Sequence, residues 1–249
     1  MSNHQYFKFS NAVVFAPLFA VLSIWTVYWV ELAQKLNFNA YGIYPQTISG
    51  LKGIVLSPFI HGSLEHLYNN TIPLAVLLAA LFYFYNKIAW KVVMLGVVLS
   101  GLITWGIGRP SYHIGASGLI YVLASFIFFK GAFLKHYRLV ALSLVVVFVY
   151  GRLLWYIFQV KEGYSWEGNL GGFLTGLLLA LLIRAKVPLP KKFDWEKEDF
   201  KEEEDPFLRQ FDQEGNFVEL QPPLENHSDK DHAIQVKYIF KKDDNSTEK

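Results

Sequence analysis

Two apolar runs follow each other closely in LEHLYNNTIPLAVLLAALFYFYNKIAWKVVMLGVVLSGLITWGI, residues 64–107. A helix that crosses about 30 Å of hydrocarbon needs about 20 mostly apolar residues. Residues 64–85 and 88–107 each reach that length, and only two residues separate them. The stretch therefore predicts two membrane-spanning helices joined by a tight turn.

Four further runs of this kind lie on either side, over residues 11–30, 115–129, 139–158 and 167–183. The first is too long for a cleavable signal peptide and has no small-x-small site before Glu31, so we expect a retained helix. Together the six runs predict an all-α membrane protein, a bundle of six transmembrane helices.

The charges divide the chain into two parts. Before Pro190 there are 13 basic and four acidic residues, a net of +9, and the remainder carries −7. This division excludes a single soluble globular domain. We expect a membrane domain over residues 11–186, with an acidic, mostly disordered tail over 187–249 in which aromatic residues offer docking points for a cytoplasmic partner.

Basic loop residues predict the orientation, because positively charged loops stay in the cytoplasm. The residues on one side of the predicted bundle are Lys87, Lys91, Lys130, Lys135, Arg138, Arg184 and Lys186. Both termini, including the short segment 1–10, are therefore predicted to be cytoplasmic. The aromatic-rich segment 31–63 is expected to lie on the outer membrane surface, packed on its own side chains.

Composition excludes several kinds of chemistry. The chain has no cysteine, so it has no disulfide or thiolate nucleophile. The first aspartate is Asp194, beyond the last predicted span, which excludes an aspartyl intramembrane protease. The stretch HGSLEH, residues 61–66, lacks the spacing of a zinc-binding His-Glu-x-x-His helix. We expect no metal, no cofactor and no nucleic acid.

Polar residues gather in three places where an apolar helix begins. Such residues are costly in a membrane unless they are paired or line a wet cavity. The stretch HGSLEHLYNN, residues 61–70, places His66 and Asn70 on one helical face. In SYHIGASG, residues 111–118, Ser117 lies between two glycines, and in SWEGNLGGFLTG, residues 165–176, Asn169 precedes a Gly-x-x-x-Gly pair.

These three motifs, in this order, resemble the rhomboid family of intramembrane serine proteases of bacterial type over residues 57–182. The resemblance implies hydrolysis of a peptide bond in or near a transmembrane segment of another protein, in the bacterial inner membrane. It implies these roles: Ser117, between Gly115 and Gly118, as nucleophile, His66 and Asn70 as oxyanion donors, His61 as a supporting residue, and Gly172 and Gly176 as the close helix contact.

Asn169 departs from the family, whose members carry the general-base histidine at this position. A neutral amide cannot take the serine proton. Three alternatives remain: an impaired protease, an inactive pseudoprotease that binds membrane-protein helices, or a protease in which another base, with His113 nearest in sequence, replaces the histidine. A small-solute transporter is the rival from another class, although the sequence lacks the paired repeats that such proteins favour.

Two further polar features have structural interpretations. Arg152 lies inside an apolar run and is expected to reach the interface or to pair with Glu162 or Glu167. Ser165 and Glu167 fit an N-cap and a first helical turn.

Overall fold

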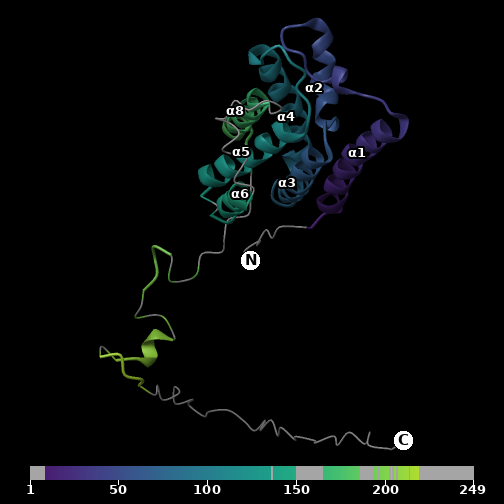
Figure 1. Cartoon of the computed structure of the whole chain (residues 1–249). Helices are drawn as coiled ribbons and strands as arrows, with labels where there is room; N and C mark the ends of the chain where they lie inside the picture. The colour runs from purple at the N-terminus through teal and green to yellow at the C-terminus, as the bar shows by residue number, and fades with distance from the viewer. Residues whose placement is uncertain are drawn as a thin grey trace, which may run out of the picture. The chain divides into compact units, whose positions relative to one another are not determined.

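The computed structural model describes residues 9–135, 137–149 and 165–185, with short pieces between residues 193 and 218. The chain divides into two compact units, Met1–Pro190 and Lys191–Lys249. The long helices of the described residues all belong to the first unit (Figure 1).

The first unit is built from helices. Their bounds are α1 Ala12–Gln34, α2 Gly53–Leu56, α3 Leu64–Phe84, α4 Asn86–Ile107, α5 Ser117–Phe133, α6 Tyr137–Val149 and α8 Trp166–Leu182, with 3-10 turns at Asn39–Tyr41, Ile48–Lys52 and Ser57–Phe59. Over the described residues there is no strand, only isolated bridges between single residues. The all-α prediction is confirmed.

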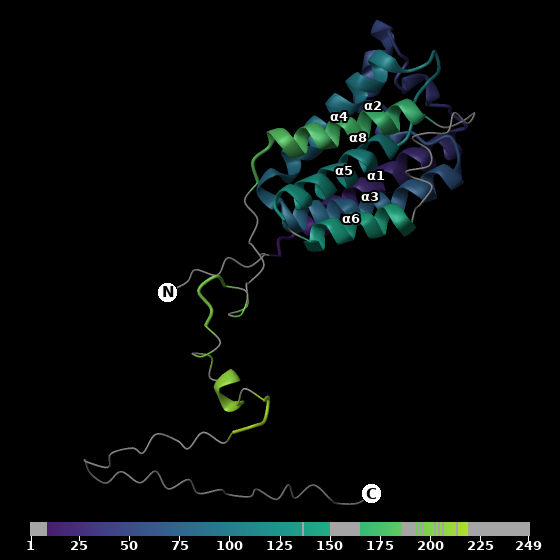
Figure 2. The same cartoon turned by 90° about the vertical axis from the view of Figure 1, so that its left-hand side faces the viewer.

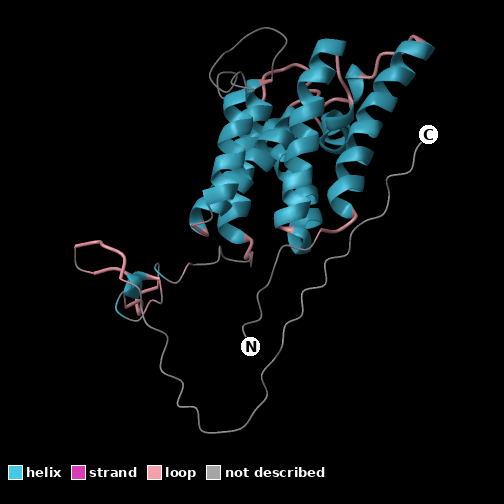
Figure 3. Ribbon diagram, turned by 90° about the horizontal axis from the view of Figure 1, so that it is seen from below, coloured by secondary structure: helices cyan, strands magenta, loops and turns pink. Residues whose placement is uncertain are grey.

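The predicted spans coincide with these helices, and the main helices run alongside one another with their connections at the two ends (Figure 3). Helices α1, α3 and α4 are long and apolar enough to cross a membrane, and α5 and α8 are shorter apolar helices. The second half of the predicted 139–158 span, with Arg152, lies outside the described residues.

Helix α5 occupies the centre of the first unit and contacts α3, α4, α6 and α8 (Figure 2). Residues 120–127 of α5 are all buried, as expected for a helix that is apolar on every side. Helix α1 packs on α3 at an edge of the unit (Figure 1). Its outer face exposes Phe15, Phe19 and Trp29, which suits contact with lipid.

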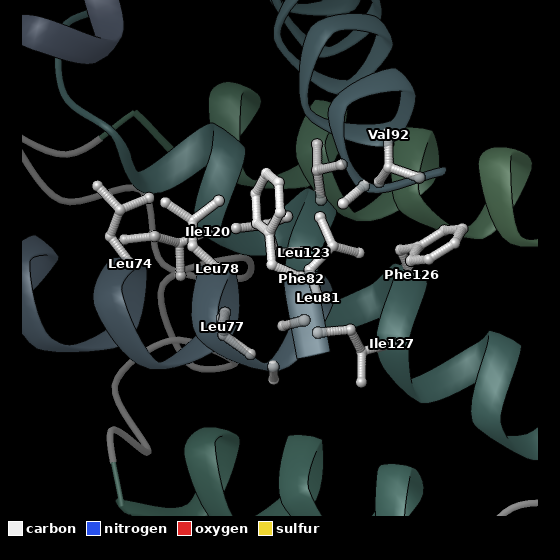
Figure 4. Close-up of a cluster of buried hydrophobic side chains, with 14 of the residues drawn as sticks. Leu74, Leu77, Leu78, Leu81, Phe82, Val92, Ile120, Leu123, Phe126 and Ile127 are labelled. Atoms are coloured by element: carbon white, nitrogen blue, oxygen red, sulfur yellow. The ribbon is translucent and has the colours of Figure 1, made fainter. Parts of the chain in front are cut away.

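The hydrophobic core lies mainly between α3 and α5. Leu74, Leu77, Leu81 and Phe82 of α3 are almost completely buried. Figure 4 shows them beside Ile120, Leu123, Phe126 and Ile127 of α5, with Val92 of α4. This packing fixes α5 against α3, and thereby places the start of α5 close to the start of α3.

Glycines allow α8 to approach α5 at backbone distance. A methyl group at Gly172 would overlap the carbonyl oxygen of Gly118, and one at Gly176 would overlap the carbonyl oxygen of Val122 and the hydroxyl of Ser125. Small residues at this spacing are the usual means of close helix packing in membranes. The contact brings the first two turns of α8 against the first turns of α5.

Lys130 reinforces the same pair of helices at its other end. The sequence suggested a loop lysine after the fourth span, but Lys130 lies inside α5, is buried, and donates from Nζ to the carbonyl oxygen of Ala180 at 2.9 Å. A cation near the end of α8 satisfies a carbonyl that has no intrahelical partner. Lys130 therefore stabilises the contact between α5 and α8, in addition to adding a positive charge near the predicted cytoplasmic end of α5.

The segment between α1 and α3 packs on itself, where the Phe38 and Tyr41 rings meet edge to face, and on the end of α4 and the α4–α5 loop. The rings of Tyr44 and Tyr112 meet edge to face at 5.0 Å, and Trp105 Nε1 donates to the carbonyl oxygen of Thr47 at 2.9 Å. Ile43 and His113 exchange two backbone hydrogen bonds, of 3.0 and 2.8 Å. These contacts hold the α4–α5 loop, which leads to Ser117.

A small aromatic turn forms in the second unit. The Asp212 carboxylate accepts the backbone N–H groups of Glu214 and Asn216 and the Asn216 side chain, and these bonds, first of all that from the Asn216 backbone, lower the pKa of Asp212. The rings of Phe207, Phe211 and Phe217 pack in sequence around the turn. The tail prediction contained no such element.

The α5–α8 contact predicts a sharp difference between two glycines. Gly176→Ala forces α8 away from α5, and overpacking of this kind costs about 1–3 kcal/mol. Gly106→Ala is the matched control, since a methyl group there meets nothing within 4 Å and alanine favours the helix. Thermal unfolding of the detergent-solubilised protein should show a lower melting temperature for Gly176→Ala alone. Equal shifts for both variants would contradict the packing argument.

Candidate active site

Ser117 begins α5 immediately after a strained turn. Gly115 has φ +105°, in the left-handed region that glycine tolerates, and its N–H donates to the carbonyl oxygen of Ser57 at 2.8 Å. A side chain at Gly115 would also meet the His66 ring, with Cε1 and Nε2 at 2.6 Å from the added carbon. Glycine is therefore required here both for the backbone conformation and for the close approach of His66.

Two histidine rings lie against this turn. His61 and His66 meet edge to face with centroids 5.0 Å apart, although they are five residues apart in sequence and His61 precedes the helix. His61 Nε2 lies 3.5 Å from the Ala116 N–H, and its Nδ1 lies 3.4 Å from the carbonyl oxygen of Phe59. The carbonyl accepts only, so Nδ1 carries the hydrogen and Nε2 is the acceptor.

Burial keeps His61 uncharged. Loss of hydration, followed by the neighbouring His66, lowers the pKa of His61 to about 3. The ring therefore serves as a neutral acceptor that holds the backbone just before Ser117.

Asn70 lies one turn further along α3 than His66 and is buried. Its amide nitrogen donates to the backbone carbonyl oxygen of His66 at 2.7 Å. The predicted shared face of His66 and Asn70 is thus present, with the second hydrogen of the amide still available for another acceptor.

Asn169 lies in the first turns of α8 and is buried. The same part of α8 packs on the start of α5, because a methyl group at Gly118 would meet the carbonyl oxygen of Gly168 at 3.4 Å and Gly172 lies against Gly118. Among the described residues, the Asn169 side-chain oxygen has no hydrogen-bond partner. A buried acceptor left in this way costs about 1–3 kcal/mol.

A cavity of about 40 Å³ opens beside Ser117, where α4, α5 and α8 meet the loops. That space admits water. Its polar lining comes from Ser57, Ser100, Thr104, His113, Ser117 and Ser165. Of the predicted site residues, Gly115, Ser117 and Gly118 line it, whereas His61, His66, Asn70, Asn169, Gly172 and Gly176 do not.

Comparison with known proteins agrees with this architecture. A family model described as Rhomboid domain matches residues 49–186, more than half of the chain. The chain belongs to the rhomboid family. Uncharacterized proteins of Mycobacterium bovis and Mycobacterium tuberculosis are each 36% identical to it over 176 residues, 64% of this chain and 71% of theirs. An uncharacterized protein of Mycobacterium leprae is 34% identical over 176 residues, 64% of this chain and 68% of its own.

The family match covers α3, α4, α5, α6 and α8, and it contains every predicted site residue. The resemblance in the sequence is therefore confirmed at the level of the family, and this rhomboid is an integral membrane protein with an all-α bundle.

An ion pair joins the start of α8 to the α4–α5 loop. Glu167 is almost completely buried and lies 3.5 Å from Arg109 Nε, while the Arg109 N–H donates to the same carboxylate oxygen at 3.3 Å. Arg109 belongs to the α4–α5 loop. The pairing expected for Arg152, with Glu162 or Glu167, lies outside the described residues. The pair connects α8 to the loop that leads to Ser117.

The contact that the sequence did not reveal joins His113 to Ser165. His113 Nδ1 lies 2.6 Å from Ser165 Oγ, and His113 Nε2 lies 3.1 Å from the carbonyl oxygen of Arg109. Ser165 is the N-cap of α8, as predicted, and accepts the Gly168 N–H at 3.1 Å. Both residue types were visible in the sequence, but 52 residues separate them and no local pattern predicts their contact.

The low pKa of His61 predicts an acid-sensitive fold. In the unfolded chain His61 becomes protonated below pH 6.5, whereas in the folded protein it stays neutral down to about pH 3. The free energy of unfolding therefore falls as the pH falls from 6.5 towards 3. The slope is about 1.4 kcal/mol per pH unit for one group, or about 2 kcal/mol between pH 6.5 and pH 5. Thermal unfolding at several pH values should show a shallower dependence for His61→Asn than for the chain as written. Identical slopes would contradict the assignment.

The Arg109–Glu167 pair predicts a non-additive pair of substitutions. Arg109→Gln leaves a buried carboxylate without its cation and should destabilise the protein by about 3–5 kcal/mol. Adding Glu167→Gln removes that charge, so the double variant should recover part of the loss. Chemical or thermal unfolding in detergent measures the cycle, with Glu65→Gln, an exposed acid in the first turn of α3, as control. Strict additivity would show that the two side chains are not coupled.

Proposed function

We propose that this rhomboid binds transmembrane segments of other membrane proteins beside Ser117, and that its reaction is hydrolysis of a peptide bond in or near such a segment, slowed in this chain by Asn169. The observation that carries the proposal is the packing of α8 on α5. Gly172 against Gly118 places the turn of α8 that contains Asn169 beside the turn of α5 that begins with Ser117.

In this proposal Ser117 is the nucleophile. Its own N–H, together with His66 and Asn70, stabilises the oxyanion of the tetrahedral intermediate, and loss of one such donor costs about 2.7–4 kcal/mol in a serine protease. Support comes from the contact of the His66 ring with Gly115, two residues before Ser117. His61 supports the same turn through the Ala116 N–H.

Asn169 decides the rate. An amide does not titrate near pH 7 and cannot relay the proton of Ser117 to the leaving amine. Serine proteases that lack one member of their catalytic set retain only about 10³–10⁴-fold catalysis over water. The expected protein is therefore a strongly slowed endopeptidase in the bacterial inner membrane, with six spans and both termini in the cytoplasm.

The second candidate is a pseudoprotease that binds membrane-protein helices without cutting them. The buried oxygen of Asn169, which has no hydrogen-bond partner among the described residues, favours it, because an amide that accepts no proton from Ser117 supplies no base for hydrolysis. The helix packing at Gly172 and Gly176 does not depend on hydrolysis. In this case the acidic tail supplies contacts to a cytoplasmic partner.

The variant Asn169→His tests the proposal. It supplies an imidazole beside Ser117, so labelling of Ser117 by a fluorophosphonate and cleavage of a model transmembrane substrate in proteoliposomes should rise by about 10²–10⁴-fold. The double variant Ser117→Ala with Asn169→His should lose both signals. Peptide mass spectrometry must locate the label, since a serine elsewhere can also react.

Two outcomes would contradict the slowed-protease proposal. Full-rate labelling of Ser117 in the chain as written would show that Asn169 is no impediment. An Asn169→His variant that remains unlabelled at Ser117, while it still binds substrate helices, would favour the pseudoprotease.

A further inference from the structure

The Ser165–His113 contact has a defined direction of proton donation. The carbonyl oxygen of Arg109 can only accept, so His113 Nε2, 3.1 Å away, carries the imidazole hydrogen. His113 Nδ1 then has a free lone pair, and the Ser165 hydroxyl donates to it at 2.6 Å. A serine that donates to a neutral imidazole, itself oriented by a third group, is the arrangement of an activated nucleophile.

Hydrogen bonds to neighbouring residues hold this pair in place. The backbone of His113 exchanges two hydrogen bonds with Ile43, and the His113 side chain is buried. Ser165 Oγ accepts the Gly168 N–H at 3.1 Å as the cap of α8. A base and nucleophile fixed by their neighbours in this way retain the geometry that proton transfer needs.

The electrostatic surroundings keep the imidazole available as a base. Burial lowers the pKa of His113, and the charged groups that face it are the Glu167 carboxylate and the Arg109 guanidinium, which act in opposite directions. The ring is therefore neutral at pH 7. Trp166 and Glu167, the first residues of α8, offer backbone N–H groups that have no intrahelical acceptor and suit a developing oxyanion.

Both side chains also line the water-sized cavity that Ser117 lines. Ser165 is partly exposed and lies at this cavity. Asn169, by contrast, does not line this cavity.

We propose that Ser165 and His113 form a second serine–histidine pair, which gives this rhomboid a nucleophile independent of position 169 and directed at small acyl carbonyl groups, esters or peptide bonds, that reach the cavity. Ser165 Oγ forms a bond to the carbonyl carbon while its proton passes to His113 Nδ1. The carbonyl electron pair moves to oxygen and then returns as the bond to the leaving group breaks, and the leaving group takes the proton from His113. Water repeats the sequence and releases the acid and free Ser165.

The alternative is a purely structural tether between the α4–α5 loop and the start of α8. A tether affects stability when it is cut, but it has no reason to make Ser165 reactive. The reactivity of one named oxygen, and its dependence on pH, therefore distinguish the two roles.

The test labels the full chain, in detergent, with a fluorophosphonate at pH 8 and maps the modified serine by peptide mass spectrometry. In this reaction Ser165 Oγ bonds to phosphorus, fluoride leaves, and His113 takes the proton. We expect label on Ser165 in the chain as written. His113→Gln should lower the labelling rate at least about 100-fold, and the rate in the unchanged chain should fall as the pH drops through the pKa of His113.

Controls separate reactivity from folding. Ser165→Asn keeps a good helix cap and should keep the melting temperature while the label disappears. Ser111→Ala, in the same loop two residues from His113, should leave labelling unchanged. Absence of label on Ser165 overturns the proposal, and so does labelling of Ser165 that does not respond to His113→Gln. Failure of the Ser117 proposal is recorded on a different peptide, in the Asn169→His chain, so the two outcomes remain distinct.

Discussion

The backbone contact between α5 and α8 is the constraint on which the rest of this structure depends. Within a membrane the hydrophobic effect contributes little to the association of helices, because lipid tails are as apolar as the side chains. Close van der Waals packing therefore holds the helices together. Gly172 and Gly176 permit that packing because no side chain separates their backbone from the carbonyl oxygens of Gly118 and Val122. The same contact determines what position 169 faces, since it fixes the rotation and height of α8 relative to Ser117.

The loops before α3 and α5 and at the start of α8 hold the first turn of α5 in place. Gly115 turns the chain into α5 with a left-handed backbone conformation, and the absence of a side chain lets the His66 ring lie against it. On the other side, Arg109 and His113 join the α4–α5 loop to Glu167 and Ser165 at the start of α8. The start of α5 is thus held from α3 on one side and from α8 on the other, and a site built on fixed elements keeps its geometry.

The sequence predicted the features that depend on local order. Length and apolarity predicted the helices, the Ser165 cap followed from residue type and position, and the spaced glycines predicted a close helix contact. The contacts between distant segments were not predictable in the same way. His61 meets His66 because the turn before α3 folds back, and Glu167 meets Arg109 because the start of α8 lies against the α4–α5 loop. A charged or polar residue in an apolar helix indicates that it needs a polar partner. The sequence does not indicate which of several distant residues lies close enough to be that partner.

Whether another histidine can act as the base for Ser117 depends on the hydrogen bonds that each imidazole makes, and not on the number of histidines in the chain. His61, His66 and His113 lie around the start of α5, and each of these side chains contacts a different neighbour. His61 holds the Ala116 backbone, the His66 ring lies on Gly115, and His113 accepts from Ser165. An imidazole acts as a base only for the hydroxyl that it bonds. Among the described residues, the hydroxyl that bonds to an imidazole is that of Ser165, so the base that we propose serves Ser165 and not Ser117.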